Sequence, residues 1–556
     1  MKKGILLVLF AMFTQISFSQ DKLIDILKNE INRNFILLKE RPVPAYYMSY
    51  RVQDTKRHAI TASFGNLTYS APLHQRRFNV DIRVGSHEMD NTRELKAGSS
   101  GNSGNRYENN VLSVEDDPVA IQTELWRNSD QIYKDAVKQF ENVKANVAVK
   151  VASEDKSNDF TQESSEKYFE KPLQIADLKF DASEWEKKLK QYSNVFSDNK
   201  DILNCSANFS VELVRKYFVD TEGREIAENA YSYRIQITAL TIAEDGMELP
   251  LYQSYFAINA KDLPSDEQII KDTKKLSALI SELRKAPVAE SYSGPALMTA
   301  EAAGVFFHEI FGHRVEGARL KQESDAQTFK KKVGELVLPK DISIFFDPKL
   351  KEYKNIPLNG SYVFDDEGIR GQRVDVVKNG ILNRFLMSRT PIEGFSNSNG
   401  HGRAMIFYNN VTRQSNMIIE SNNPKSDKEL RTLLIEQSKK ENKQYGYLFD
   451  KVSGGFTTTG RYMPNAFNVT PLIVYRVYTD GRPDELVRGV DLVGTPLSIF
   501  SQVEACGNDH GVFNGACGAE SGSLPVSCVS PTLFIKMIET QKKAKSQTQP
   551  PVLERP

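Results

Sequence analysis

The sequence predicts an α+β protein, with an N-terminal α+β domain followed by a β-rich C-terminal domain. The chain has 556 residues, more than the roughly 100 to 200 residues that one domain usually holds. In the first half, apolar residues recur at both helix and strand spacings, whereas strand spacing prevails in the second half. Hydrophobic residues make up 40% and charged residues 26% of the chain, as in a water-soluble protein with a large core.

Changes in this pattern divide the chain into four expected parts. These are a signal peptide at 1–20, the N-terminal α+β domain with insertions at 21–290, the β-rich C-terminal domain at 291–540, and a flexible tail at 541–556.

The first twenty residues have the features of a secretory signal peptide. Lys2 and Lys3 precede an apolar run from Ile5 to Phe13, and small and polar residues follow. A membrane anchor is the alternative, but this run is shorter than the roughly 20 residues that a spanning helix needs. We therefore expect cleavage near Gln20 and an exported protein, periplasmic or secreted, without stable membrane insertion.

The N-terminal domain is predicted to alternate helices and strands. Leu23, Leu27, Ile31, Phe35 and Leu38 lie three or four residues apart, which is typical of one apolar helix face. Strands are expected at 46–52, 59–69 and 78–84, and a hairpin with its turn at 222–223. Further helices are expected at 129–143, after an N-cap at Ser183, and at 264–285; a Gly/Ser loop at 96–105 and an exposed polar insertion at 153–168 interrupt them.

The C-terminal domain is predicted to open with one helix, in the segment MTAEAAGVFFHEIFGH, and to continue mostly as strands. A hairpin turn is expected at Asn379–Gly380, and a further strand at 469–478.

The charge balance argues against nucleic acid as a partner. Lys plus Arg and Asp plus Glu number 72 each, so no excess of positive charge exists to attract phosphates.

The segment HEIFGH places His308, Glu309 and His313 on an otherwise apolar helix. Two imidazoles beside a carboxylate indicate a zinc site in which the carboxylate accepts a proton from metal-activated water. The two histidines lie five residues apart, which separates them by about 140° on a regular helix. We therefore expect the helix to be distorted, by a wider i to i+5 turn that Gly312 permits. Two satisfied core histidines are the alternative.

A third protein ligand must come from elsewhere in the chain. The Gly-rich segment EACGNDHGVFNGACGAESGSLPVSC offers several candidates: Cys506, Asp509, His510, Cys517, Glu520 and Cys528. Cys517, between Gly515 and Gly518, has the most open surroundings, and a bound metal would protect its thiol. Cys506 and Cys528 are interpreted as small buried hydrophobes or as a disulfide pair, and the state of Cys205 stays open.

These motifs resemble those of the TldD/PmbA family of modulator-of-gyrase-type metallopeptidases. HEIFGHRVEG is similar to the family's H-E-x-x-x-H-x-x-E-G block, and NGACGAESGSLPV to its G-x-C-G-K-x-G-Q-x-V-P-V block. FDDEGIRGQ, NGIL and SNGHGRA lie between them in the family's order. Ala519 and Ser523 depart from the family's Lys and Gln, and the N-terminal half is longer.

The resemblance implies one zinc per subunit, bound by His308, His313 and Cys517, with Glu309 as general base. It also implies subunits that pair around a cavity admitting unfolded peptides, as a homodimer or as a heterodimer with a related subunit. The expected function is zinc-dependent hydrolysis of unfolded or extended peptides. The alternatives are a non-catalytic, chaperone-like peptide-binding subunit and a zinc hydrolase of esters or small amides.

Two supporting roles stay open at this point. His401, Arg403 and His510 are candidate donors to the developing oxyanion, although each is more readily explained as structural. Glu316 either orients a ligand imidazole or is an ordinary surface charge.

Overall fold

The computed structural model describes residues 21–95, 110–149, 155–178, 180–325, 327–460, 467–543, 548–553 and 555–556. These residues form an α+β fold in which sheets dominate, as expected. The predicted signal peptide and the Gly/Ser loop at 96–105 lie outside the described residues. Among the described helices, none is both long and apolar enough to cross a membrane.

The N-terminal half contains one large sheet and four α-helices. Its strands are β1 Ala45–Ser63, β2 Asn66–Val84, β3 Val111–Leu112, β4 Lys167–Phe169, β5 Asn204–Asp220, β6 Glu225–Ile242 and β7 Glu248–Ala257. Its helices are α1 Lys22–Lys39, α2 Pro118–Val149, α3 Ala182–Asn194 and α4 Asp266–Lys285, with short 3-10 turns η1 Ile175–Leu178 and η2 Ala260–Asp262.

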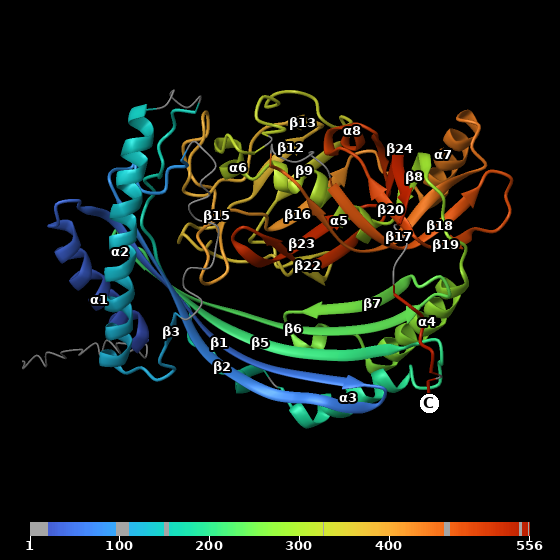
Figure 1. Cartoon of the computed structure of the whole chain (residues 1–556), viewed down its shortest axis with the longest axis horizontal. Coiled ribbons are helices and arrows are strands. Elements are labelled where there is room, and N and C mark those ends of the chain that lie inside the picture. The colour runs from blue at the N-terminus through green and yellow to red at the C-terminus, as the bar shows by residue number, and fades with distance from the viewer. Residues whose placement is uncertain are drawn as a thin grey trace, which may run out of the picture.

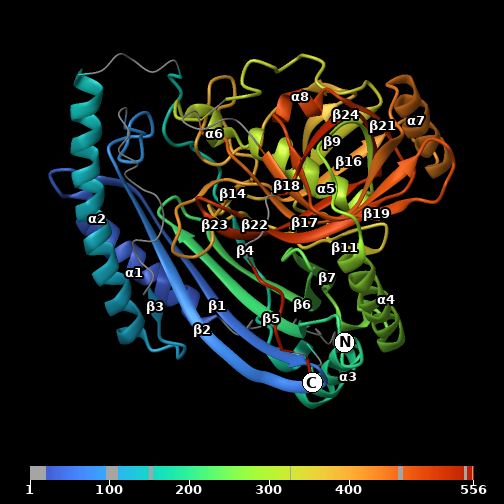
Figure 2. The same ribbon diagram turned by 45° about the vertical axis from the view of Figure 1, so that its right-hand side comes forward.

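The helices of this half cover one face of the curved sheet. The strand order is β3-β2-β1-β5-β6-β4, with β7 also paired to β6. Alternate residues of β1, from Met48 to Ala62, pack against the helices in two apolar clusters. The opposite face turns toward the C-terminal half, as Figures 1 and 2 show. Arg51 of β1 and Tyr252 of β7 donate hydrogen bonds across to the carbonyl oxygens of Ala404 and Val452.

Local details of the N-terminal half differ from the prediction. The three predicted strands between residues 46 and 84 are two long strands, because β1 turns into β2 at Phe64 and Gly65, both with positive φ. The predicted strand at 59–69 therefore runs across a turn that its apolar residues conceal. The helix expected at 129–143 is the longer α2, and the N-cap of α3 is Asp181, whose carboxylate accepts from the backbone of Ser183.

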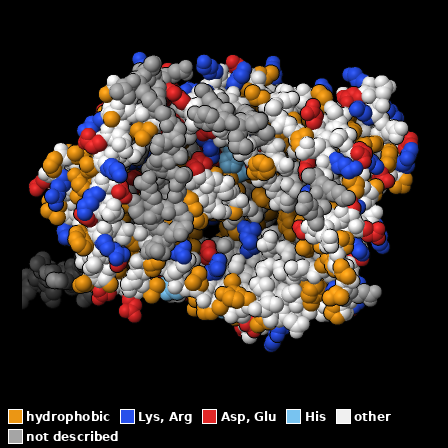
Figure 3. Space-filling view, viewed as in Figure 1, with side chains coloured by type: hydrophobic (Ala, Val, Ile, Leu, Met, Phe, Trp, Pro, Cys, Tyr) orange, Lys and Arg blue, Asp and Glu red, His pale blue; other side chains and the backbone are white. Residues whose placement is uncertain are grey.

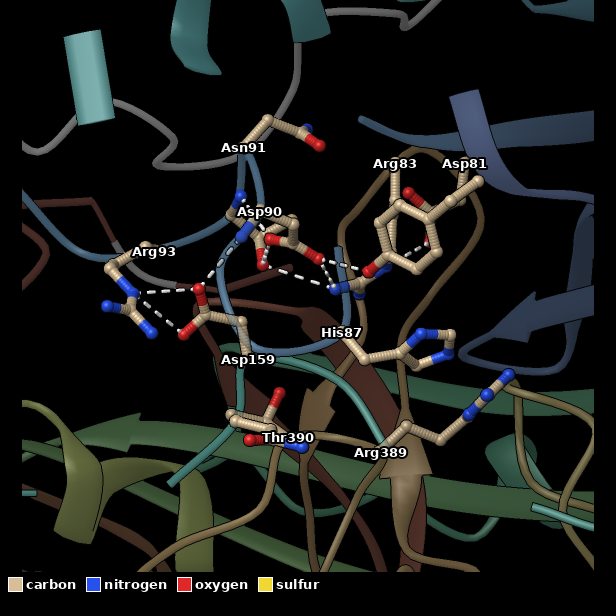
Figure 4. Close-up of polar contacts among 12 residues, drawn as sticks. Asp81, Arg83, His87, Asp90, Asn91, Arg93, Asp159, Arg389 and Thr390 are labelled. Atoms are coloured by element: carbon tan, nitrogen blue, oxygen red, sulfur yellow. Dashed lines mark hydrogen bonds and ion pairs between the residues drawn. The ribbon is translucent and has the colours of Figure 1, made fainter. Parts of the chain in front are cut away.

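The prediction of an exposed insertion at 153–168 was wrong for its first described part, because Asp155, Asp159, Phe160 and Thr161 are buried. Residues 162–168 are exposed or half-buried, as expected. Asp159 accepts hydrogen bonds from Arg93 and from the backbone of Asp90 (Figure 4). The ring of Phe160 lies 3.8 Å from the guanidinium of Arg83 and 3.7 Å from that of Arg389. The polar groups of this segment form hydrogen bonds with residues that are remote in the sequence, such as Arg93 and Arg389. The segment therefore joins the two halves of the molecule.

The C-terminal half contains the helix of the HEIFGH segment and most of the strands. The helices and 3-10 turn are α5 Ala300–Ile310, η3 Gly312–Arg314, α6 Gly317–Lys321, α7 Asp427–Lys440 and α8 Pro496–Phe500. The first strands are β8 Tyr292–Met298, β9 Ile342–Phe346, β10 Glu352–Tyr353, β11 Ile356–Pro357, β12 Val374–Lys378, β13 Ile381–Leu382, β14 Gly402–Arg403, β15 Val411–Thr412 and β16 Asn416–Ser421. The remaining strands are β17 Tyr445–Thr457, β18 Phe467–Tyr478, β19 Glu485–Val487, β20 Val490–Val493, β21 Val503–Cys506, β22 Gly511–Ala519, β23 Gly522–Ser530 and β24 Leu533–Lys542.

Two sheets enclose α5. One has the order β13-β12-β9-β16-β23-β22, and the other has the order β17-β8-β24-β20-β18-β19, in which β17 and β18 also pair. The helix contacts β22 and β23 of the first sheet and β17 and β18 of the second. This explains why its sequence is apolar all round, since a helix with two buried sides has no solvent stripe. The predicted hairpin turn at Asn379–Gly380 is present between β12 and β13.

The C-terminal half and the N-terminal sheet leave a hollow between them on one face of the molecule. Figure 3, in the orientation of Figure 1, shows this hollow near the centre of the molecule, with Lys and Arg side chains at its rim. The predicted domain limits themselves stay predictions. Near the C-terminus, Arg555 donates hydrogen bonds to the carbonyl oxygens of Asn199 and Ile202 in the N-terminal half.

Candidate metal centre

The two histidines lie on either side of the end of α5. His308 and Glu309 are in its last turn, and the helix ends at Ile310 with Phe311 as C-cap, at φ −120° and ψ −53°. Gly312 to Arg314 then form a 3-10 turn that contains His313. The predicted departure from regular helix is therefore present. The predicted form was wrong, because the chain leaves the helix and tightens into i to i+3 bonding instead of widening to i to i+5.

Position 312 has no room for a side chain, which explains its glycine. Its φ is not positive, and a Cβ added there would lie 2.0 Å from Oε1 of Gln414. The close approach of the buried Gln414 side chain, and not backbone latitude, accounts for this glycine.

The structure brings His308, His313 and Cys517 together. Sγ of Cys517 lies 3.0 Å from Nε2 of His308 and 3.3 Å from Nε2 of His313. One donor atom from each residue lies within 4.8 Å of the other two, and all three side chains are buried. Cys517 reaches this position because β22 packs against α5.

Charges in this cluster are strongly coupled. Burial alone would raise the pKa of the Cys517 thiol, but His308 and His313 outweigh it and hold that pKa well below its usual value. Burial likewise opposes a charge on His313, yet Glu316 and Cys517 raise its pKa to about 9. A thiolate beside two imidazoles is a donor set that suits zinc, which binds nitrogen and sulfur ligands.

Glu316 is fully buried and orients His313, so a surface charge is excluded. Its Oε2 lies 3.1 Å from Nδ1 of His313 and accepts a hydrogen bond of 2.7 Å from Nε of Arg319. A carboxylate on Nδ1 fixes the imidazole so that Nε2 faces Cys517.

Glu309 is buried beside the three donors without being one of them. Burial raises the pKa of its carboxyl, and the neighbouring His308 and His313 lower it in part. Among the described residues, none donates a hydrogen bond to this carboxylate. Gly455 of β17 leaves room for it, since a Cβ there would lie 2.6 Å from Cγ of Glu309.

The other sequence candidates lie outside this cluster. Asp509 accepts from the backbone and hydroxyl of Thr532, and His510 lies against Lys354. Glu520 accepts a hydrogen bond from Arg319. His401 and Arg403 are buried and bonded to interior groups. All four cysteines are free thiols, so a disulfide between Cys506 and Cys528 is excluded, although Sγ of Cys528 lies 3.8 Å from Nδ1 of His308.

Sequence reasoning missed two arginines that hold the cluster. Arg413 donates to the carbonyl oxygen of Cys517 at 2.6 Å, and its Nε lies 3.7 Å from Oε1 of Glu316. Arg319 could have been found, since it lies three residues after Glu316 on one helix face. Arg413 carries no such local signal, because its partners are about a hundred residues away in the chain.

The fold and the cluster define a class: an α+β protein with a buried His/His/Cys group that could hold a metal ion. Residues 291–542 match the family model described as "PmbA/TldA metallopeptidase C-terminal domain". The C-terminal half of this chain therefore carries the C-terminal domain of the TldD/PmbA family.

Curated relatives match this chain over part of their length. A "Metalloprotease" of Archaeoglobus fulgidus is 30% identical over 273 residues, which cover 49% of this chain and 57% of the relative. A "Zinc metalloprotease TldD homolog" of Saccharolobus solfataricus is 24% identical over 356 residues, or 62% of this chain and 73% of that protein. This chain therefore spans little more than half the length of the first of these relatives.

Solved structures share the fold at low sequence identity. TldE from Thermococcus kodakarensis has a TM-score of 0.60 at 13% identity, covering 93% of this chain and 100% of that one. A putative modulator of a DNA gyrase from Thermotoga maritima has a TM-score of 0.59 at 16% identity, covering 92% of this chain and 99% of that one.

Proposed function

We propose that this chain is a zinc-dependent metallopeptidase that hydrolyses peptide bonds in unfolded or extended peptides. The observation that carries the proposal is the convergence of His308, His313 and Cys517 beside the carboxylate of Glu309. The names of the curated relatives support the same class of activity.

In this proposal, His308, His313 and Cys517 hold one zinc ion per subunit. When bound, zinc supplies Lewis acidity to a peptide carbonyl and to water. Glu309 would accept the proton released from water and later donate it to the leaving amine, a role that its buried position beside the three donors supports. Hydrolysis consumes one water, whose hydroxyl goes to the acyl group and whose proton goes to the amine. Glu316 keeps His313 in the ligand orientation.

The wider context is proposed as well. We infer an exported protein after cleavage near Gln20, paired with a second copy or with a related subunit. A chaperone-like peptide-binding subunit is the second candidate, but a buried carboxylate beside three metal-type donors favours hydrolysis. An ester or small-amide hydrolase would use the same groups, and assays with those substrates separate it from a peptidase.

The test is Glu309→Gln, which keeps the size of the side chain but cannot accept the proton. Peptide hydrolysis should fall by about 10² to 10⁴ fold, the usual contribution of a positioned general base, while zinc content and fold are kept. The measurements are turnover of an unfolded peptide and metal content by mass spectrometry.

Glu301→Gln is the matched control, because Glu301 is a second, half-buried carboxylate of α5 whose pKa burial also raises. It should keep parental activity. Equal rates for Glu309→Gln and the parent at equal zinc content would refute the assignment of the base. Peptide binding without hydrolysis by the zinc-loaded parent would favour the chaperone-like candidate.

A further inference from the structure

Arg234 links the N-terminal sheet to the strand that carries Cys517. It lies on β6, on the face turned toward the C-terminal half. Its Nη1 donates to the carbonyl oxygen of Asn514 on β22 at 3.0 Å and to the hydroxyl of Ser254 at 3.3 Å. Asn514 is three residues before Cys517, so Arg234 contacts β22 about 10 Å from the cluster, at roughly 3.3 Å per residue.

Among the described residues, no carboxylate pairs with the positive charge of Arg234. Burial alone lowers its pKa, with no carboxylate acting on it. Its cross-strand neighbours, Ser210 and Phe256, are neutral. By contrast, Arg57 on the same face lies directly opposite Glu212 on the neighbouring strand. Burial raises the pKa of the Glu212 carboxyl, and the charge of Arg57 lowers it in part. A half-buried guanidinium without a carboxylate is unusual, because buried charges are normally paired.

Two donor groups of Arg234 make no hydrogen bond to the described residues. Its Nε and Nη2 donate to no described residue, so one side of the planar guanidinium is available. β22 is the last strand of its sheet, so no other described strand pairs with its outer edge beside Arg234. The hydrogen bond to Asn514 occupies the strand edge on one side of Cys517.

We propose that Arg234 binds a carboxylate of the peptide substrate, with the free C-terminus as the group that best fits its position. This inference rests on the proposed function and specifies the substrate: peptides with a carboxylate about three residues from the bond that is cut. A guanidinium binds a carboxylate through two parallel hydrogen bonds, which a neutral amide cannot replace.

The test compares three peptides of neutral sequence. The first ends in a free acid, the second in an amide, and the third in an amide after a terminal Glu. The parent should have a kcat/KM about 10 to 100 fold higher for the free acid than for the plain amide, the range expected for a charge-assisted pair. Arg234→Gln should remove this preference by raising KM for the acid, with the amide unchanged. Preference for the Glu peptide instead would assign the carboxylate to a side chain, which also supports the role of Arg234.

Arg57→Gln is the matched control and should keep the preference, because Glu212 already balances that charge. Equal cleavage of acid and plain amide by the parent would overturn the proposal. So would an equal fall for all three peptides in Arg234→Gln, which would limit Arg234 to holding β22 in place.

Equilibrium binding keeps this inference separate from the proposed function. Zinc-loaded Glu309→Gln should bind the acid about 10 to 100 fold more tightly than the plain amide, and the Arg234→Gln double variant should not. That difference without hydrolysis by the parent would refute the peptidase and keep the carboxylate site. Equal affinities for both peptides would refute the carboxylate site alone.

Discussion

At the scale of single residues, the roles of the four cysteines are set by their neighbours. Cys205, Cys506 and Cys528 are as buried as Cys517, yet only Cys517 contacts two imidazoles with its sulfur. Burial alone raises the pKa of a thiol, as it does to about 12 for Cys506, with nearby aspartates adding to it. A low-pKa thiolate is the form that binds metal, so Cys517 is distinguished by charge and not by exposure.

We expect about one zinc per chain in the parent, and little or none after Cys517→Ala, His308→Ala or His313→Ala. Each variant removes one of three protein ligands, and a site with two ligands binds zinc weakly. Metal content by mass spectrometry measures the effect. Cys506→Ala is the control for loss of a buried thiol and should keep its zinc. Full occupancy in Cys517→Ala would remove this residue from the site.

At the scale of elements, the end of α5 decides whether both histidines can face Cys517. A regular helix would separate the two side chains by about 140°. The change to a 3-10 turn at Gly312 alters the direction in which His313 points. The turn is held by Gln414, which fills the space where a larger residue at position 312 would lie.

Gly312→Ala should therefore destabilise the protein by about 1 to 3 kcal/mol, the usual cost of overpacking a buried site. It should also reduce zinc content, since His313 is the next residue. Chemical denaturation and metal analysis measure the two effects. Gly518→Ala is the matched control, because no atom lies within 4 Å of a Cβ added there. Equal stability of the two variants would show that Gln414 moves aside freely.

At the scale of the whole molecule, the segment from Asp155 to Thr161 joins the two halves. Ser157 donates to the carbonyl oxygen of Pro391, and the backbone of Thr161 donates to that of Arg389. Lys321 of α6 donates to the carbonyl oxygen of Ser157, so the segment also reaches the helix that carries Arg319.

Phe160→Ala should loosen this junction. Removing a buried phenylalanine costs about 3 to 5 kcal/mol, and here it also removes the contact with Arg83 and Arg389. Hydrogen exchange should accelerate in the segment from 386 to 398 before it does so in the core of β16. Phe169→Ala is the control, because Phe169 is 51% exposed. Unchanged exchange in Phe160→Ala would show that the junction is held by its ion pairs alone.

Much of the fold could be predicted because it follows from the local spacing of apolar residues and from turn dipeptides. The α1 helix, the β5–β6 hairpin and the turn at Asn379–Gly380 each have an apolar spacing or a turn dipeptide that needs no remote partner. Prediction failed for two different reasons. The turn at Phe64 and Gly65 has a local glycine signal, which the apolar residues around it concealed. Phe160 is buried among partners that are distant in the sequence, including Arg83 and Arg389.

The α+β class, the helix with its two histidines, and Cys517 as the best candidate for a third ligand could all be inferred from the sequence alone. Composition, spacing and motif order are properties of the chain alone. Three other features depend on tertiary packing: the helix tightens at Gly312, Arg413 holds Cys517, and Arg234 has no carboxylate partner among the described residues. The physical reason is that space, burial and charge pairing depend on which distant segments pack together, whereas periodicity depends only on neighbours in the chain.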